Sequence, residues 1–505
     1  MTAFGLVDDA RLDVAGVLDE TPRNRFHRRA VVASGVGFFT DAYDLFVIST
    51  VAALVAAQWH LSTTQRSFVL GAAVLGAFVG AMVFGRIADL LGRKVVYVTV
   101  AGVMIAGALA SAFSMDLWWL IGARFVLGLG IGGDYPVCAV LMSEYSNRSD
   151  RGRLVGLVFS MQALGLIVGP LVALSLLSSG VAHPLTWRLL LGLGALPAAG
   201  VVWLRSKMPE SPRYEAQVRG NGSKAAADLR LVGEGLSSGG GRAGAVTPPA
   251  AARQATMRQL LGNPRMLLLL LGTAGGWLLF DYAYYGNTLS LPVILKAVAP
   301  SASLDVQLAW TLGIFVVCAV PGYFLAVALM DRIGHRRLQL IGFGVMAACF
   351  GTLGLVAPLT TLVAPFLAIF GISYFFVEFG PNTTTFVLPS EVFPVSARAT
   401  GHGLSAGLGK LGAFVGVFLV PALQSSLGLR WMLSISALAA LCGIGVTLVL
   451  PEPARRSLED VSGGWGPASA SGSSSSHLAE ETPPAMAAVV AAPAPPGEAA
   501  DRASA

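Results

Sequence analysis

Long, continuously apolar stretches alternate with short polar segments along the chain. A helix needs about 20 mostly apolar residues to cross the hydrocarbon core of a bilayer. Twelve stretches are long enough: 31–58, 67–85, 95–113, 117–142, 154–178, 187–204, 266–295, 308–330, 338–357, 361–388, 401–424 and 431–450. They lack the apolar and polar alternation of the strands of a membrane β-barrel. The pattern predicts an all-α membrane protein with twelve transmembrane helices.

The composition excludes most other classes. Apolar residues make up 54% of the chain and charged residues only 12%, whereas a soluble globular protein has about 25% charged residues. A soluble enzyme, a nucleic-acid-binding protein and a disordered scaffold therefore fit this composition poorly. The sequence also lacks the GxxxxGK[ST] loop that would indicate an ATPase. We expect no enzyme activity, no cofactor, no metal and no nucleic-acid partner. The surplus apolar surface is expected to face the lipid bilayer.

Lys and Arg are unevenly distributed over the predicted loops. The chain has 34 of them, and Arg124 and Lys410 lie well inside spans. Only four others fall on one side of the membrane: Arg66, Arg188, Lys296 and Arg430. The rest fall on the other side, which the positive-inside rule makes cytoplasmic. With an even number of spans, this predicts a multi-pass protein of the plasma membrane with both termini in the cytoplasm.

The spans divide six and six around a polar segment. Residues 205–265 are rich in Gly, Ala and Ser, with SSGGG at 237–241, and predict a flexible cytoplasmic linker. The tail has low-complexity runs at 471–476 and 492–496 and is predicted to be largely disordered. The predicted parts are a cytoplasmic N-terminal segment (1–30), a first half (31–204), the linker, a second half (266–450) and a cytoplasmic tail (451–505).

The two halves repeat each other. GRIADLLGRK at 85–94, between spans two and three, is matched by DRIGHRR at 331–337, between spans eight and nine. After span four, Glu144 precedes Arg151 by seven residues, and after span ten Glu391 precedes Arg398 by seven. Two matches in the same order indicate parallel six-helix halves. Such halves are typical of transporters that rock about a site near the bilayer midplane.

The repeated loops resemble those of the major facilitator superfamily. GRIADLLGRK is similar to the loop 2–3 motif of that superfamily. The resemblance implies that Asp89 and the turn after it form a charged contact that closes the cytoplasmic side. Pro209 to Arg213 (PESPR), Pro451-Glu452 and Ser457 to Asp460 (SLED) resemble the pattern shared by sugar and phosphate porters. From the loop 2–3 motif, the repeated loops and the arginine inside span four, we expect a gating or structural role for eight residues: Asp89, Arg93, Arg124, Glu144, Arg151, Asp331, Glu391 and Arg398.

Narrower motifs resemble the phosphate:proton symporters of plants and fungi. They are TDAYDLF at 40–46, GGDYP at 132–136 with MSEY at 142–145, and GPNTTTF at 380–386. The resemblance covers roughly residues 30–460 and implies import of inorganic phosphate together with protons by alternating access. Glu378 departs from the family, which usually has Asn at this position. A porter of the same fold for a phosphate ester or another organic anion, and a non-transporting phosphate receptor, remain alternatives.

Seven ionisable residues lie at membrane depth: Asp41, Asp44, Arg124, Asp134, Asp281, Glu378 and Lys410. Each costs roughly 2.5–3.5 kcal/mol at the bilayer centre on insertion scales. If all were ionised, their charge would sum to −3, which would repel an anion. Some carboxyl groups must therefore be protonated when the anion is present. This charge balance favours proton-coupled entry of an anion.

Three carboxyl groups of the first half are candidate proton carriers. Asp41 and Asp44 are three residues apart and share one helical face. Asp134 follows two glycines and precedes Pro136, so the backbone there can approach a neighbour and bend. We interpret Asp41 and Asp134 as proton carriers, a role that the resemblance also implies, with Asp44 assisting. The alternative is an ion pair of Asp44 or Asp134 with Arg124.

The candidate phosphate site centres on span seven. Trp277, Asp281 and Tyr285 are spaced four and four and form one helical stripe. Phosphate is rich in acceptors and needs donors, and a protonated Asp281 would donate on binding and repel the anion on ionising. The resemblance adds three residues from spans four, five and ten: Tyr135, Gln162 and Asn382. Lys410 would pair with Asp281 or Glu378 in the empty state and release to the anion, or form a purely structural salt bridge.

Overall fold

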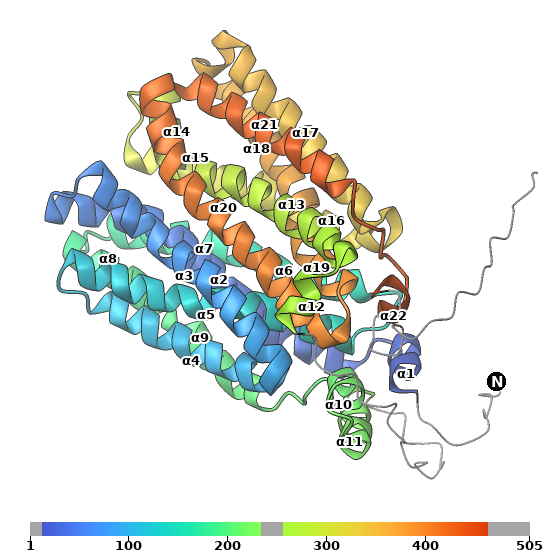
Figure 1. The fold of residues 1–505 in the computed structure, drawn as a ribbon. Helices are drawn as coiled ribbons and strands as arrows, with labels where there is room; N and C mark the ends of the chain where they lie inside the picture. The colour runs from blue at the N-terminus through green and yellow to red at the C-terminus, as the bar shows by residue number, and fades with distance from the viewer. Residues whose placement is uncertain (1–12, 234–255, 463–505) are drawn as a thin grey trace, which may run out of the picture. The chain divides into compact units, whose positions relative to one another are not determined.

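In a computed structural model of the chain, residues 13–233 and 256–462 are described, and their regular structure is helical (Figure 1). Twelve helical segments in this part are long and apolar enough to cross a membrane. They are α2 (Arg25–Trp59), α3 (Thr63–Leu91), α4 (Arg93–Ala112), α5 (Leu117–Tyr145), α6 with α7 (Arg151–Ser160, Gln162–Ser178), α8 with α9 (His183–Leu193, Ala195–Ser206), α13 (Pro264–Leu289), α15, η2 and α16 (Leu304–Ile314, Phe315–Ala319, Val320–Ile333), α17 (His335–Leu355), α18, η4 and α19 (Val363–Val377, Glu378–Asn382, Thr383–Val392), η5 with α20 (Val395–Ala397, Arg398–Leu427) and α21 (Leu429–Thr447). The prediction of a twelve-helix membrane protein is confirmed.

Shorter helices connect or flank the spans. They are α1 (Val14–Glu20), α10 (Pro212–Gln217), α11 (Gly222–Val232), α12 (Met257–Leu261), α14 (Leu291–Val298), η3 (Ala357–Thr360) and α22 (Leu458–Ser462). The seventh span is shorter than predicted, because α13 ends at Leu289 and α14 starts anew, with Pro292 in its first turn. A proline lacks the N–H that would continue the first helix.

The prediction of a flexible linker is wrong for the described parts of residues 205–265. Helices α10 and α11 both begin at capping side chains: Ser211 Oγ accepts from the amide of Tyr214, and Asn221 Oδ1 from the amide of Lys224. Tyr214 is also buried, and its hydroxyl donates to the carbonyl of Asp89. Capping and burial thus overcome a weak apolar pattern. The SSGGG run at 237–241 and the tail runs lie outside the described residues.

Glycines allow the spans of each half to pack closely. In the first half α3 packs on α5, and in the second half α13 packs on α20. A Cβ atom on Gly132 would collide with the carbonyl oxygen of Ala77, and one on Gly412 with that of Leu278. Across the halves, α3 packs on α20 and α6 on α16. These crossings bring polar side chains of both halves into one buried layer.

The tenth span is interrupted in its middle. Helix α18 passes through the π-helical segment η4 into α19, and Gly380 within η4 has non-helical angles of φ −113° and ψ −105°. Pro381 follows it and has no N–H to donate. Such π segments frequently mark functional sites in helices. Glu378 and Asn382 lie at the two ends of this break.

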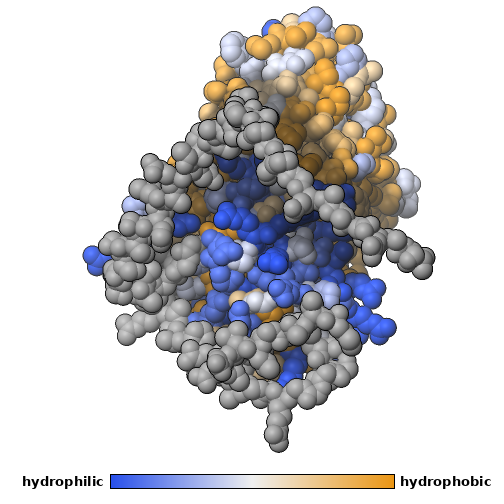
Figure 2. Space-filling view, turned by 90° about the vertical axis from the view of Figure 1, so that its right-hand side faces the viewer, coloured by the Kyte–Doolittle hydropathy of each residue, from blue (hydrophilic) through white to orange (hydrophobic). Residues whose placement is uncertain are grey.

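One end of the bundle is polar, and we call it the basic end. Helices α1, α10, α11 and α22 gather there, together with the loops after α3 and α16 (Figure 1). Viewed from this side, hydrophilic residues cover the end of the bundle, whereas its flank is hydrophobic (Figure 2). The opposite end carries α14 and the start of α8 (Figure 1). The apolar flank fits contact with lipid tails.

Candidate transport site

The second half contributes a buried ion pair at the centre of the bundle. Lys410 Nζ lies 3.0 Å from Asp281 Oδ2 and 3.1 Å from the hydroxyl of Tyr285. The ammonium also lies 4.3 Å from the ring centroid of Tyr285 and 4.7 Å from that of Tyr135. Asp281 and Tyr285 sit one turn apart on α13, and Lys410 faces them from α20. Of the two predicted partners of Lys410, the structure selects Asp281.

A chain of hydrogen bonds joins the two halves beside this ion pair. Gln162 Nε2 donates to the Tyr135 hydroxyl at 3.0 Å, and the Tyr323 hydroxyl donates to Gln162 Oε1 at 3.3 Å. Asn382 Nδ2 then donates to the Tyr323 hydroxyl at 2.7 Å. The indole of Trp277 packs against the ring of Tyr135, with centroids 6.0 Å apart.

The structure therefore brings all seven predicted binding residues together: Tyr135, Gln162, Trp277, Asp281, Tyr285, Asn382 and Lys410. Each has at most 4% of its surface exposed. Tyr323 completes the hydrogen-bond chain, and sequence reasoning missed it. Its only signal was a tyrosine in an otherwise apolar span, which is common and carries little information.

Asp134 pairs with a cation that sequence reasoning placed elsewhere. Arg205 Nη1 and Nη2 lie 2.6 and 2.7 Å from the two oxygens of Asp134, so the contact is bidentate. The alternative pairing of Asp134 with Arg124 is therefore wrong. Arg205 stands at the end of the sixth span, four residues before Pro209, and was counted among the loop residues. The structure buries it completely and places it over the ring of Tyr97, 4.4 Å from the centroid.

The two acidic residues of α2, Asp41 and Asp44, are less well neutralised than Asp134. Arg124 Nη1 lies 3.8 Å from Asp44 Oδ1, and its Nη2 donates to the backbone oxygen of Asp44 at 2.8 Å. The ion-pair alternative thus holds for Asp44. Both carboxyl oxygens of Asp41 are buried with no hydrogen-bond partner among the described residues. Among the three described carboxyl groups at membrane depth in the first half, Asp41 is therefore the one without an ion pair.

Including Arg205 changes the charge balance. The ionisable groups at membrane depth, with Arg205 added, are then five carboxyl groups (Asp41, Asp44, Asp134, Asp281 and Glu378) and three cations (Arg124, Arg205 and Lys410), all of them buried. The net charge is −2, with all groups ionised, instead of −3. The three cations pair with Asp44, Asp134 and Asp281. The two unpaired carboxyl groups are Asp41 in the first half and Glu378 in the second.

Aromatic side chains close the layer on both sides. Toward the basic end, Phe386 of the second half stacks on Phe159 of the first, with centroids 4.5 Å apart, and contacts Phe38 at 4.9 Å. Toward the opposite end, Phe46 of the first half stacks on Tyr285 of the second at 5.8 Å. The polar layer is thus shielded from both ends, and the structure represents a closed state.

Charged residues lock the halves together at the basic end. Asp89 Oδ2 accepts from the backbone N–H and the hydroxyl of Thr400 at 2.7 and 2.6 Å, in the first turn of α20. Glu144 lies 3.2 Å from Arg93 and 3.4 Å from Arg398. Arg398 therefore pairs across the halves, and the spacing within each repeat did not indicate this partner. We call the contacts of these five residues the latch.

The second half mirrors part of this arrangement. Asp331 Oδ2 accepts from the backbone N–H of Arg153 in the first turn of α6, at 2.9 Å. His335 lies 3.2 Å from Asp331 and 3.1 Å from Glu391. Each half thus places one carboxylate, from the last turn of α3 or α16, at the start of a helix of the other half, where the helix dipole favours negative charge. The loops that repeat in the sequence thus make equivalent carboxylate-to-helix contacts across the two halves.

Neutralising Asp89 is expected to loosen the latch. An Asp89→Asn variant keeps an acceptor at the start of α20 but loses its charge, which is worth about 1–2 kcal/mol and therefore about 5–30-fold in the open population. In a background without native cysteines, a Ser143→Cys reporter should react with a maleimide faster by that factor. Ser143 is fully buried, and its hydroxyl donates to the backbone oxygen of Ser390 across the halves. Asp116→Asn, which neutralises the cap of α5 at the opposite end, should leave the rate unchanged; equal acceleration by both variants contradicts the latch.

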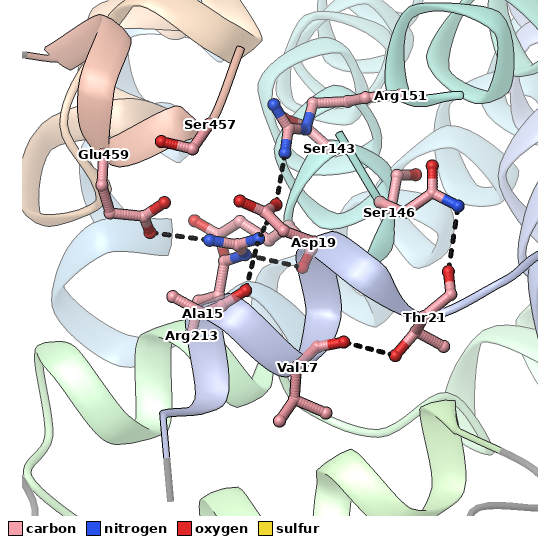
Figure 3. Close-up of polar contacts among 12 residues, drawn as sticks. Ala15, Val17, Asp19, Thr21, Ser143, Ser146, Arg151, Arg213, Ser457 and Glu459 are labelled. Carbon is pink, nitrogen blue, oxygen red and sulfur yellow. Dashed lines mark hydrogen bonds and ion pairs between the residues drawn. The ribbon is translucent and has the colours of Figure 1, made fainter. Parts of the chain in front are cut away.

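A second cluster at the basic end ties four chain segments together (Figure 3). Asp19 of α1 lies 2.6 Å from Arg213 of α10 and 2.8 Å from Arg151 of α6. Arg213 also lies 2.6 Å from Glu459 of α22. Arg151 thus forms an ion pair with a residue of the N-terminal segment. Sequence reasoning missed Asp19, since a single carboxylate in a polar segment has no distinguishing pattern.

The Arg213–Glu459 contact should persist in mild acid. Burial alone would raise the pKa of Glu459, but the guanidinium groups of Arg213 and Arg398, with hydrogen bonds from Gln217 and Arg213, together outweigh burial and lower the pKa to about 2. Because this pKa lies below its ordinary value, the ion pair stabilises α22 above about pH 4.5 and is lost as the pH falls toward 2. Amide hydrogen exchange over 458–462, corrected for intrinsic rates, should therefore be equal at pH 5 and pH 7.

Removing the cation provides the matched test. Arg213→Ala should accelerate that exchange a few-fold at both pH values, because a partly exposed ion pair contributes about 0–1 kcal/mol. Arg230→Ala, an exposed cation of α11, serves as the control and should change nothing. Protection that is already lost at pH 5 in the unmodified chain would show that Arg213 does not hold Glu459 ionised.

The comparisons with known proteins agree with this architecture. Residues 29–465 match the family described as sugar (and other) transporter. Inorganic phosphate transporter 1-6 of Oryza sativa subsp. japonica is 36% identical, over 90% of this chain and 96% of that protein. Low affinity inorganic phosphate transporter 4 of Petunia hybrida is 35% identical, over 90% of this chain and 94% of that protein. The structure of the major facilitator superfamily proton:xylose symporter XylE superposes with a TM-score of 0.72 at 19% identity, covering 87% of this chain and 99% of that one.

The fold and these matches define a membrane transporter of the major facilitator superfamily, not an enzyme. The chain belongs to the sugar (and other) transporter family and, within it, to the family of inorganic phosphate transporters. The resemblance detected in the sequence is thereby confirmed. The roles of the individual site residues remain predictions.

Proposed function

We propose that this protein imports inorganic phosphate together with protons across the plasma membrane by alternating access. The observation that carries the proposal is the buried Lys410–Asp281 pair within a layer of hydrogen-bond donors from both halves. The names of the relatives, which are inorganic phosphate transporters, support the choice of substrate. A solved structure of the same fold is that of a proton:xylose symporter, which supports the proposed coupling to protons.

The donors in this layer match the chemistry of phosphate. The anion presents mainly acceptor oxygens, and Lys410, Tyr285, Tyr135 and the amides of Gln162 and Asn382 can all donate. In the closed state Lys410 is neutralised by Asp281. Phosphate would take the place of the carboxylate beside the ammonium, while Asp281 accepts a proton. Ionisation of Asp281 after opening then restores the pair and expels the anion.

The first half would supply further proton sites. Asp41 is buried without a cation, so its ionised form is costly in this closed state and its neutral form is favoured. Asp134 is neutralised by Arg205, so this pair must separate before Asp134 takes up a proton. We assign Asp41 as the principal proton carrier of this half, with Asp44 and Asp134 contributing as their arginine partners move.

The basic end would face the cytoplasm, and both termini would lie there. The excess of Lys and Arg in the loops at this end supports this orientation. The latch at Asp89 and Glu144 then closes the cytoplasmic exit and opens after phosphate and protons have bound. Phosphate release follows into the cytoplasm.

Counterflow tests the substrate directly. Proteoliposomes loaded with unlabelled phosphate should accumulate labelled phosphate from outside, and external phosphate in excess should compete. Glycerophosphodiesters and organic anions such as citrate should compete at least tenfold less well. Stronger competition by a phosphodiester would replace phosphate with an ester as the substrate. Saturable binding of phosphate with no counterflow would indicate a receptor.

A further inference from the structure

Glu378 is a buried carboxyl group to which the mechanism above gives no role. It opens the η4 break, two residues before the non-helical Gly380, and is fully buried. Its Oε2 accepts a short hydrogen bond from Asn382 Nδ2. Its Oε1 is buried with no hydrogen-bond partner among the described residues. This carboxyl group therefore touches a candidate binding residue directly.

Neutral tyrosines, and no cation, surround this group. The titratable side chains facing it are Tyr284 and Tyr285 of α13, Tyr323 of α16 and Tyr374 of α18. The neighbouring segments α17 and α19 bring no charged side chain to it in the described part of the chain. The Tyr284 hydroxyl is itself buried without a hydrogen-bond partner. The hydroxyls of Tyr284 and Tyr323 and the amide of Asn382 face Glu378 and can donate to it, but no cation among the described residues compensates the charge of an ionised carboxylate there.

Comparison of the two halves shows why no cation is present. In the first half Arg205, four residues before the Pro209-Glu210 pair, neutralises Asp134 of the fourth span. The corresponding position in the second half, four residues before Pro451-Glu452, is Thr447, which accepts a hydrogen bond from Gln339. The cation that the repeat would supply to the tenth span is thus absent. Lys410 is already engaged with Asp281.

We propose that Glu378 is an additional proton carrier of the transport cycle, located in the second half. In the closed state it holds a proton, because an uncompensated carboxylate at this depth is costly. When the basic end opens, water reaches the carboxyl group, its O–H bond breaks, and the proton leaves to water while the electron pair stays as carboxylate. Reopening at the opposite end reprotonates it from the other side. The inference rests on the proposed phosphate:proton symport.

The hydrogen-bond chain gives this proton a route to influence the anion. Asn382 bonds both Glu378 and Tyr323, and Tyr323 continues to Gln162 and Tyr135 beside Lys410. Ionisation of Glu378 would hold the Asn382 amide more tightly, because hydrogen bonds to charged acceptors are stronger than neutral ones. Asn382 would then be withdrawn from phosphate. Loss of this proton therefore weakens phosphate binding in the state that releases it.

The proton-to-phosphate ratio tests the proposal. Labelled phosphate and proton influx, reported by a trapped pH dye, are measured in the same proteoliposomes. Glu378→Gln, which is permanently neutral and keeps the side-chain length, should retain phosphate counterflow and carry one proton fewer per phosphate. Asp228→Asn, a carboxyl group of α11 outside the spans, is the control and should keep the unmodified ratio. An unchanged ratio in Glu378→Gln overturns the proposal.

A second measurement does not depend on transport. Infrared spectra of the purified protein should show the carbonyl stretch of a protonated carboxyl group, and Glu378→Gln should remove this band. If that variant does not elute as a folded monodisperse peak, Glu378→Asn takes its place. No difference between the variant and the unmodified chain overturns the proposal. Failure of the unmodified chain to take up phosphate would instead overturn the proposed function, and the infrared result would still show whether Glu378 holds a proton.

Discussion

Replacing Asp281 with Asn should lower proton-driven phosphate uptake by about 10–100-fold. The substitution removes the carboxylate that neutralises Lys410 at 3.0 Å, and with it a charged hydrogen bond worth about 1.5–3 kcal/mol. The site also loses the proton that Asp281 takes up and releases. Phosphate itself can still neutralise the ammonium, so counterflow at equal pH on both sides should be affected less than gradient-driven uptake. Uptake of labelled phosphate into proteoliposomes measures both.

A carboxyl group outside the site provides the control. Asp116→Asn neutralises the cap of α5 at the opposite end, and Asp116 contacts none of the site residues, so uptake should stay within about twofold of the unmodified chain. An Asp281→Asn variant with normal gradient-driven uptake would remove Asp281 from the mechanism. Equal loss in counterflow and in driven uptake would assign it to phosphate binding alone.

Replacing Arg205 with Ala should cause the largest loss of stability. Arg205 neutralises Asp134 through two short contacts and also donates to the backbone oxygen of Tyr97 at 3.2 Å. Removing one partner of a buried ion pair leaves the other charge uncompensated and typically costs 3–5 kcal/mol. The variant should therefore melt at a clearly lower temperature in detergent, followed by intrinsic fluorescence or by loss of the monodisperse elution peak.

The double variant separates charge from packing. Arg205→Ala combined with Asp134→Asn has no uncompensated charge and should recover at least half of the lost stability. Lys207→Ala, an exposed cation two residues further along, should change stability by less than about 0.5 kcal/mol. If the double variant were as unstable as Arg205→Ala alone, the loss would come from packing against Tyr97 and not from the buried charge.

The fold followed from the sequence because the bilayer imposes a length on apolar segments. The twelve predicted stretches each correspond to an observed span, since lipid-facing and buried positions are both apolar and the run stays continuous. Details set by single residues were lost. The seventh span ends early at Ser290 before Pro292, and the linker folds where Ser211 and Asn221 cap short helices.

The site was predicted in part, and the missing part has a physical reason. Helical spacing placed Asp281 and Tyr285 on one face, and family motifs supplied Gln162 and Asn382. Partners brought together by tertiary packing left no local pattern. Arg205 stands at the end of a span, where a cation is ordinarily a loop residue, and only the fold shows that it reaches Asp134.

The latch illustrates the same limit. Equal spacing of Glu144 to Arg151 and of Glu391 to Arg398 revealed a repeat, but in the described structure neither glutamate forms an ion pair with the arginine of its own repeat. Glu144 contacts Arg398 across the interface, and Arg151 contacts Asp19 of the N-terminal segment. A repeat encodes two similar surfaces, and their mutual contact appears only when the two halves are assembled.

The most direct test of coupled transport is phosphate uptake by proteoliposomes with and without an inward proton gradient. With the outside acidic, labelled phosphate should accumulate inside above its external concentration, and a protonophore should reduce it to equilibration. The same vesicles at equal pH on both sides should only equilibrate. Accumulation that is identical with and without the gradient, and insensitive to the protonophore, would contradict the central claim that phosphate and protons move together.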